Sequence, residues 1–183
     1  GIAAGDLLIL CDFAASGAST PSGFTTAINT IAGGVARQIV SYKVADGTES
    51  GQSLSGMVNN TFSKVICAFR ASKPLNSAAH GGATSSTATG TDPASRTINA
   101  SSGTPPLLVV AAYGAFLPGG DIDPRTFDPP KDGDVGTNTS GRCLYLAWKF
   151  YGASPQDTTI DFGEPHPGGE TYSILQGCYI ELG

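Results

Sequence analysis

Val40-Ser41-Tyr42-Lys43-Val44 and Leu146-Ala147-Trp148-Lys149-Phe150 are the two stretches that decide the fold, and they lie 106 residues apart. In each, three apolar side chains alternate with Ser, Lys or Ala, which places them on one face of an extended chain. A slip of one residue would invert this order, so the preserved order favours two half-buried β-strands. Tyr42 and Trp148 occupy matched inward positions, which predicts that both pack in the same core.

Two further pairs of stretches echo each other in the same order along the chain. Leu7–Cys11 is matched by Leu107–Ala111, and Val65–Phe69 is matched more loosely by Gln176–Ile180. No stretch of ten or more residues has the apolar spacing of a helix. The sequence therefore predicts an all-β protein, an antiparallel and jelly-roll-like β-sandwich whose two pseudo-repeated halves close around a single two-layered core.

The same echo sets the expected boundaries of the domain and of its halves. Residues 1–183 are expected to form one β-sandwich domain, with a first half of about 1–71, a linking segment 72–95 and a second half of about 96–183. Alternation in the third pair of stretches places Gln176 on the inner face, which is an unusual position for a polar side chain.

The composition limits the partners that this chain can recognise. Charged residues make up only 14% of the chain, against about 25% in an average protein, and the formal net charge is −5. The ten basic residues are scattered, so a nucleic-acid partner is not expected. No run of eighteen apolar residues exists, so no membrane-spanning segment is expected either.

The four cysteines lack the spacing of a metal site or a redox motif. Cys11, Cys67, Cys143 and Cys178 lie in or beside apolar, strand-like runs, and none belongs to a C-x-x-C pair. The sequence favours free, buried thiols, with one disulfide between the matched Cys67 and Cys178 as the alternative.

The stretch Leu117–Gly136 breaks the symmetry of the two halves and carries most of the candidate binding residues. We interpret this stretch, together with Phe116 directly before it, as an interaction loop. The candidate interaction residues are Phe116, Asp121, Asp123, Arg125, Phe127 and Asp128. Asp-x-Asp pairs also supply the oxygen ligands that calcium prefers, but no glutamate closes a twelve-residue calcium loop. The weak calcium candidates are Asp121, Asp123, Asp132 and Asp134.

No set of residues with the spacing of a catalytic centre is visible in the sequence. His80 and His166 are the only histidines, and no G-x-S-x-G motif supplies a nucleophilic serine. Core packing explains Trp148 better than sugar stacking does. We therefore expect no catalytic residue, no cofactor and no enzymatic activity.

Several motifs in the first seventy residues resemble those of a known group of proteins. The motifs are Gly5-Asp6-Leu7-Leu8-Ile9, Pro21-Ser22-Gly23-Phe24-Thr25, Ser41-Tyr42-Lys43-Val44-Ala45-Asp46-Gly47-Thr48-Glu49 and Ala68-Phe69-Arg70. Together they resemble the G-D-L-L, P-x-G-W/F-T, Y-K-V-A-D/T-G-x-E and A-F-R pattern of tailed-bacteriophage virion structural proteins. In the second half, Pro105-Pro106-Leu107-Leu108-Val109 stands where the pattern has a second G-D-L-L-V, without the Gly-Asp.

The resemblance implies a structural virion protein, a capsid decoration or a fibre or spike module, that is assembled in the host cytoplasm. Its expected partners are other virion proteins, contacted through sheet edges and loops in a symmetric homo-oligomer. The alternative is an adhesion module that binds a glycan on the host surface. A concave patch of exposed aromatic side chains beside the aspartate-rich stretch would favour adhesion. A depolymerase has the least support, because no catalytic set is visible.

Overall fold

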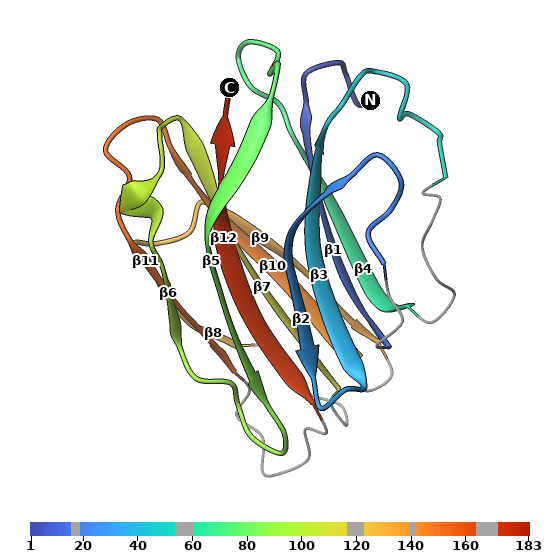
Figure 1. Ribbon diagram of the computed structural model, residues 1–183, viewed down its shortest axis with the longest axis vertical. Helices are drawn as coiled ribbons and strands as arrows, with labels where there is room; N and C mark the ends of the chain where they lie inside the picture. Colours follow the sequence, from blue (N-terminus) through green and yellow to red (C-terminus); the bar gives the residue numbers. More distant parts are fainter. Residues whose placement is uncertain (16–18, 54–60, 117–122, 140–141, 164–171) are drawn as a thin grey trace.

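The computed structural model describes residues 1–15, 19–53, 61–116, 123–139, 142–163 and 172–183, and these residues form twelve β-strands in three antiparallel sheets (Figure 1). Sheet A has the order β2 (Thr25–Ala32), β3 (Ala36–Val44), β1 (Leu7–Ala15) and β4 (Thr61–Phe69). Sheet B has the order β5 (Ala78–Ala88), β12 (Ser173–Leu182), β7 (Leu107–Phe116), β10 (Arg142–Tyr151) and β9 (Gly133–Thr139). Sheet C has the order β6 (Arg96–Ile98), β11 (Thr158–Gly163) and β8 (Asp123–Asp128).

Sheet B is the middle layer of the molecule, between sheet A on one side and the small sheet C on the other (Figure 1). The first core lies between sheets A and B and contains Phe13, Val40 and Leu146. The second core lies between sheets B and C and contains Tyr113 and Phe162. The single two-layered core expected from the sequence is therefore only part of the structure, because sheet C adds a second core.

Strand β7, at the centre of sheet B, has apolar side chains on both faces. Leu108 and Val110 point into the first core, whereas Leu107 and Val109 point into the second. Period-two alternation cannot separate an inner face from an outer face when both faces are buried. The sequence of β7, LLVVAAYGAF, is therefore a nearly continuous apolar run without a polar face.

The all-β, antiparallel sandwich predicted from the sequence is confirmed. The echoing stretches also take corresponding places, since β1 lies between β3 and β4 as β7 lies between β10 and β12. The jelly-roll-like arrangement and the duplication of the two halves stay predictions. So does the division of one domain at 72–95, although that segment contains the long strand β5.

The inner face was assigned correctly in the first half of the chain and only partly in the second. Tyr42 is buried in the first core and Trp148 packs against the same core, as expected. Ala147, expected on an outer face, is fully buried in the second core, because sheet C covers that face. Phe150, expected to point inward, is 50% exposed.

Gln176 and the cysteines are the side chains for which the sequence predicted an unusual position or bond. Gln176 lies on the inner face at 0% exposure, and neither end of its amide has a hydrogen-bond partner among the described residues. All four cysteines are free, so Cys67 and Cys178 are not joined. Burial raises the pKa of the Cys178 thiol from 9.0 to about 12, which keeps this group protonated and unreactive.

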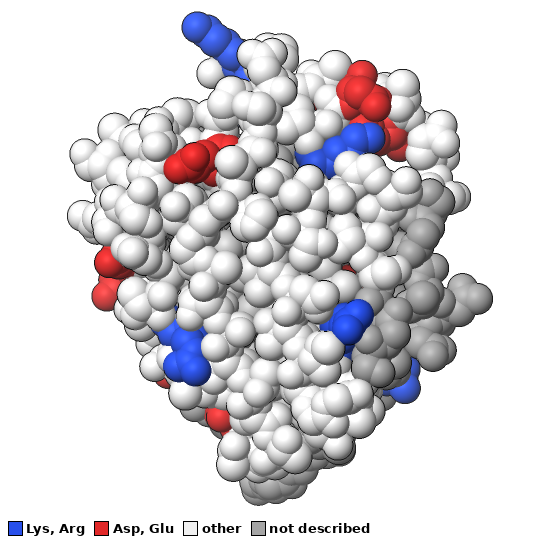
Figure 2. Space-filling model, in the orientation of Figure 1, with Lys and Arg blue, Asp and Glu red and all other residues white. Residues whose placement is uncertain are grey.

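The outer surface carries few charges. Figure 2 shows a few basic and acidic groups, scattered except where one basic group adjoins acidic ones, on a face that is otherwise uncharged. The described residues hold one three-residue helix, η1 (Ala100–Ser102), and no helix that could span a bilayer.

Candidate functional site

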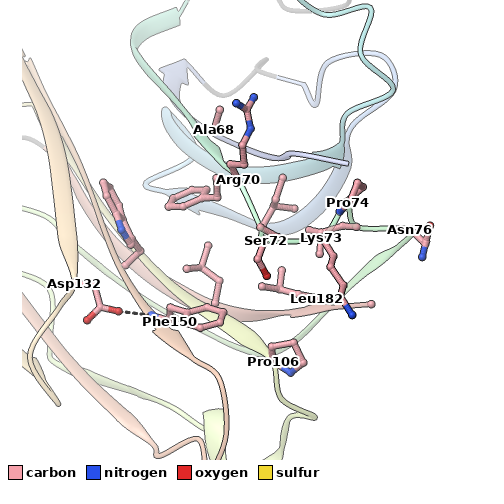
Figure 3. Close-up of a pocket in the computed structure, with 17 residues that line it drawn as sticks. Ala68, Arg70, Ser72, Lys73, Pro74, Asn76, Pro106, Asp132, Phe150 and Leu182 are labelled. Atoms are coloured by element: carbon pink, nitrogen blue, oxygen red, sulfur yellow. Dashed lines mark hydrogen bonds between the residues drawn. The ribbon is translucent and has the colours of Figure 1, made fainter. Parts of the chain in front are cut away.

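A cleft of about 880 Å³ opens between sheets A and B at the end of the molecule where both termini lie (Figures 1 and 3). We call it the end cleft. Its roof is the segment 70–76, which follows β4, and its floor comes from the ends of β10 and β12 and from Pro106. The volume lies within the range of about 300–1,000 Å³ that is usual for binding sites.

Two aromatic side chains close the inner end of the end cleft. The rings of Phe69 and Trp148 meet edge to face, with centroids 5.2 Å apart and an interplanar angle of 82°. Trp148 also packs against Gly133, where a Cβ would lie 2.6 Å from the indole ring. Because Phe69 and Gly133 both contact the indole, Trp148 forms a wall of the cleft and only part of its ring is accessible to a ligand.

Phe150 forms the floor, and its position is fixed by Asp132. The backbone N–H of Phe150 donates to Asp132 Oδ2 over 2.7 Å (Figure 3), and Lys149 Nζ lies 3.2 Å from Asp132 Oδ1. The carboxylate is therefore already paired within the chain. Phe150 remains half exposed and, with Leu182 and Pro106, offers an apolar surface to solvent.

The roof is attached to β1 by an ion pair. Arg70 donates to both carboxylate oxygens of Asp6, from Nε over 3.0 Å and from Nη2 over 2.8 Å. The hydrogen bonds from Arg70 and from the Ala3 backbone N–H lower the pKa of Asp6 from 3.8 to about 2. The Asp6 side chain is only 6% exposed, so the carboxylate needs these partners to remain charged.

Gly5 brings the roof and β1 into close contact. Its φ is +82°, and a Cβ there would lie 2.5 Å from the Cα of Pro74. Its carbonyl accepts a hydrogen bond from Leu75 N over 3.0 Å, and its N–H donates to Ala45 O over 2.8 Å. Only glycine combines this backbone conformation with this approach.

The turn after β3 completes the same end of sheet A. Glu49 accepts hydrogen bonds from the backbone N–H groups of Asp46 and Gly47, each over 3.0 Å, and pairs with Lys43 Nζ at 2.7 Å. Asp46 Oδ1 in turn accepts from the backbone N–H of Thr48 over 2.9 Å. Three of the sequence motifs therefore meet in one network, which holds β1, β3 and the roof together.

The candidate interaction residues do not form one site in the described part of the chain. Phe116 packs against the first core, where its ring is tilted by 57° to that of Phe13 with centroids 5.3 Å apart, whereas Phe127 packs against the second core beside Phe162. Asp128 is exposed at the end of β8. Asp121 lies outside the described residues, and of Asp123 and Arg125 only the backbone in β8 is described.

The weak calcium candidates that are described already have partners within the chain. Asp132 is bound as above, and Asp134 pairs with Lys131, which also donates to Tyr145 Oη. Within the described ranges, no group of three or more metal-ligating side chains comes together. His80 contacts Tyr42 Oη at 3.3 Å, and His166 lies outside the described residues.

Sequence reasoning missed the end cleft, although it had placed Phe150 in a predicted strand. The roof segment has no periodic pattern that would place it over β10. The available signal was the presence of Gly5-Asp6 and Arg70 in one motif set, because Arg70 pairs with Asp6 in the structure.

No protein-family model, curated protein or solved structure matches this chain. The functional argument therefore depends on the geometry of the end cleft and on the motifs. The cleft is lined mainly by apolar side chains. Its Arg70 and Asp132 are paired with neighbours, and its third charged residue, Lys73, is exposed. Such a site is suited to binding an apolar group.

Acid should weaken the fold through Asp6. Because its folded-state pKa is lowered, this carboxylate contributes stability above about pH 4, and the contribution is lost as pH falls toward 2. We expect Asp6→Asn to be less stable than wild type at neutral pH and to lose less stability between these pH values. Urea unfolding at several pH values measures this difference in stability.

Arg70→Gln should raise the Asp6 pKa in NMR titration. An unchanged pKa would contradict the assignment of Arg70 as the partner of Asp6.

Gly5 should resist substitution for two separate reasons. Gly5→Ala should lose about 1–2 kcal/mol for the positive φ and about 1–3 kcal/mol more for crowding against Pro74. Gly51→Ala is the matched control, because Gly51 has φ +77° but open space around its Cβ position. Denaturant unfolding should give the larger loss for Gly5→Ala. Equal losses would contradict the close contact between Gly5 and the roof.

Proposed function

We propose that this protein is a structural module of a tailed-bacteriophage virion, a capsid decoration or a fibre or spike component, that acts through protein–protein contacts. One observation carries the proposal: the residues that resemble the virion pattern, Asp6, Arg70 and the Lys43–Glu49 turn, build the end of sheet A that roofs the end cleft. The motif set thus supports a binding surface and has no catalytic geometry in it.

The chemistry of the end cleft favours an apolar protein side chain as its ligand. Interface affinity usually depends on a few anchors that fill well-packed pockets. Phe150, Leu182 and Pro106 supply an apolar floor, and the charged Arg70 and Asp132 are already paired. Lys73, the third charged residue of the lining, is exposed, so an incoming apolar group can bind while this ammonium group stays in water.

Two further properties agree with assembly into a particle in the host cytoplasm. The surface carries few charges, which suits packing against neighbouring subunits better than the steering of charged ligands. The four free cysteines, three of them buried, suit a reducing compartment.

A glycan-binding adhesion module is the second candidate, and the half-exposed Phe150 beside Asp132 is the observation that favours it. Asp132 belongs to the aspartate-rich stretch, so one exposed aromatic side chain of the end cleft lies beside that stretch. This candidate has less support, because the indole of Trp148 is covered by Phe69 and Gly133. Asp132 is also committed to Phe150 and Lys149.

Purified particles from the phage or prophage that encodes this chain provide the test. We expect mass spectrometry to find the chain at a fixed copy number, and antibodies against it to label one position in electron micrographs. Particles that lack the chain would contradict the virion proposal. Labelling at the tail tip, together with binding to host-surface oligosaccharides on an array, would select the adhesion module instead.

A further inference from the structure

Two apolar surfaces are exposed at opposite ends of the molecule. One is the end cleft. The other is the turn between β2 and β3, residues 31–35, which we call the hairpin tip. Here Ile31 is 43% exposed and Val35 is 48% exposed, two of the four large apolar side chains that are exposed in the described residues. Figure 1 places the turn between β2 and β3 at the end opposite the two termini.

The hairpin tip is a rigid projection. Gly33 and Gly34 both have positive φ, +55° and +72°, and Val35 N donates to Ala32 O over 3.1 Å, which defines a tight two-residue turn. The ring of Tyr172 packs so closely on Gly33 that a Cβ there would clash with it. The two apolar side chains are therefore held in place before any partner binds, which lowers the entropic cost of binding.

The hairpin tip and the end cleft complement each other in chemistry. Residues 31–35 carry no charge, and the cleft offers Phe150, Leu182 and Pro106. In Figure 3 the Arg70 guanidinium points away from Phe150, and the Ser72 hydroxyl points into the cleft. The remaining charge in the lining, Lys73, is exposed, so an uncharged tip can enter while its ammonium group stays in water.

We propose that the hairpin tip of one copy of this chain inserts into the end cleft of the next copy. The two surfaces lie at opposite ends, so a single molecule cannot join them, but a second copy can. Such a contact is head-to-tail: it generates a ring if the rotation closes and a filament if it does not. The inference rests on the proposed role in protein–protein contacts and does not require the virion context.

The test is the oligomeric state of purified protein from roughly 1 µM to 1 mM, measured by sedimentation and light scattering. Wild type should assemble beyond the dimer as concentration rises. The tip variant Ile31→Ser with Val35→Ser, and the cleft variant Phe150→Ser, should each weaken assembly by at least about tenfold. Ile66→Ser is the matched control, because Ile66 is 49% exposed on β4 outside both surfaces, and it should assemble as wild type does.

Mixing the tip variant with the cleft variant makes the test specific. The tip variant keeps a working cleft and the cleft variant keeps a working tip, so the mixture should form one-to-one dimers and nothing larger. Ser72→Trp, which fills the cleft from an exposed loop position, replaces Phe150→Ser if circular dichroism shows that Phe150→Ser is misfolded.

Three results would overturn the inference: wild type that stays monomeric throughout the range, tip variants that assemble normally, or a mixture that forms no dimer. Binding of oligosaccharides that perturbs Phe150 without any assembly would assign the cleft to glycan instead. A chain that is monomeric in solution but present on particles would remove the head-to-tail contact and leave the virion proposal intact.

Discussion

The structure depends on one constraint, that the central strand of sheet B, β7, has no face that water can solvate. Strand β7 contributes Leu108 and Val110 to one core and Leu107 and Val109 to the other, and all four are nearly inaccessible. A sheet with two apolar faces must be covered on both, which explains why a three-stranded sheet C lies opposite sheet A. The large buried middle layer also gives a stable support to the ends of β10 and β12, where the floor of the end cleft lies.

The polar motifs act at the one end where the layers separate. Sheets A and B diverge around the end cleft, and the Asp6–Arg70 pair, Gly5 and the Lys43–Glu49 turn hold the roof in place there. These contacts attach the roof to the chain at the start of β1. The motif residues therefore have a structural role, because their contacts hold the roof above the apolar floor of the end cleft. The same surface is the one that both proposed modes of association use.

The inner face of a strand could be predicted from the sequence where the other face is polar. It could not be predicted where both faces are apolar. The stretch around Tyr42 gave a correct inner face, whereas Ala147 was misassigned to a solvent-facing side because small or apolar residues occupy both faces of the central strands of sheet B. Strand β5 was missed because AAHGGATSSTA has the composition of a loop, and only pairing with β12 makes it a strand. The end cleft depends on contacts between residues more than sixty positions apart, which no local pattern encodes.

Hydrogen exchange of the native protein, followed residue by residue, tests the doubly buried middle sheet most directly. Amides in β7 should exchange slowest, at the rate set by global unfolding, because opening them requires both cores to separate. Amides in β6 and β8, at the edges of sheet C, should exchange faster. If β7 exchanged as fast as β6 and β8, sheet B would not be the buried middle layer, and the account given for both the fold and the end cleft would be wrong.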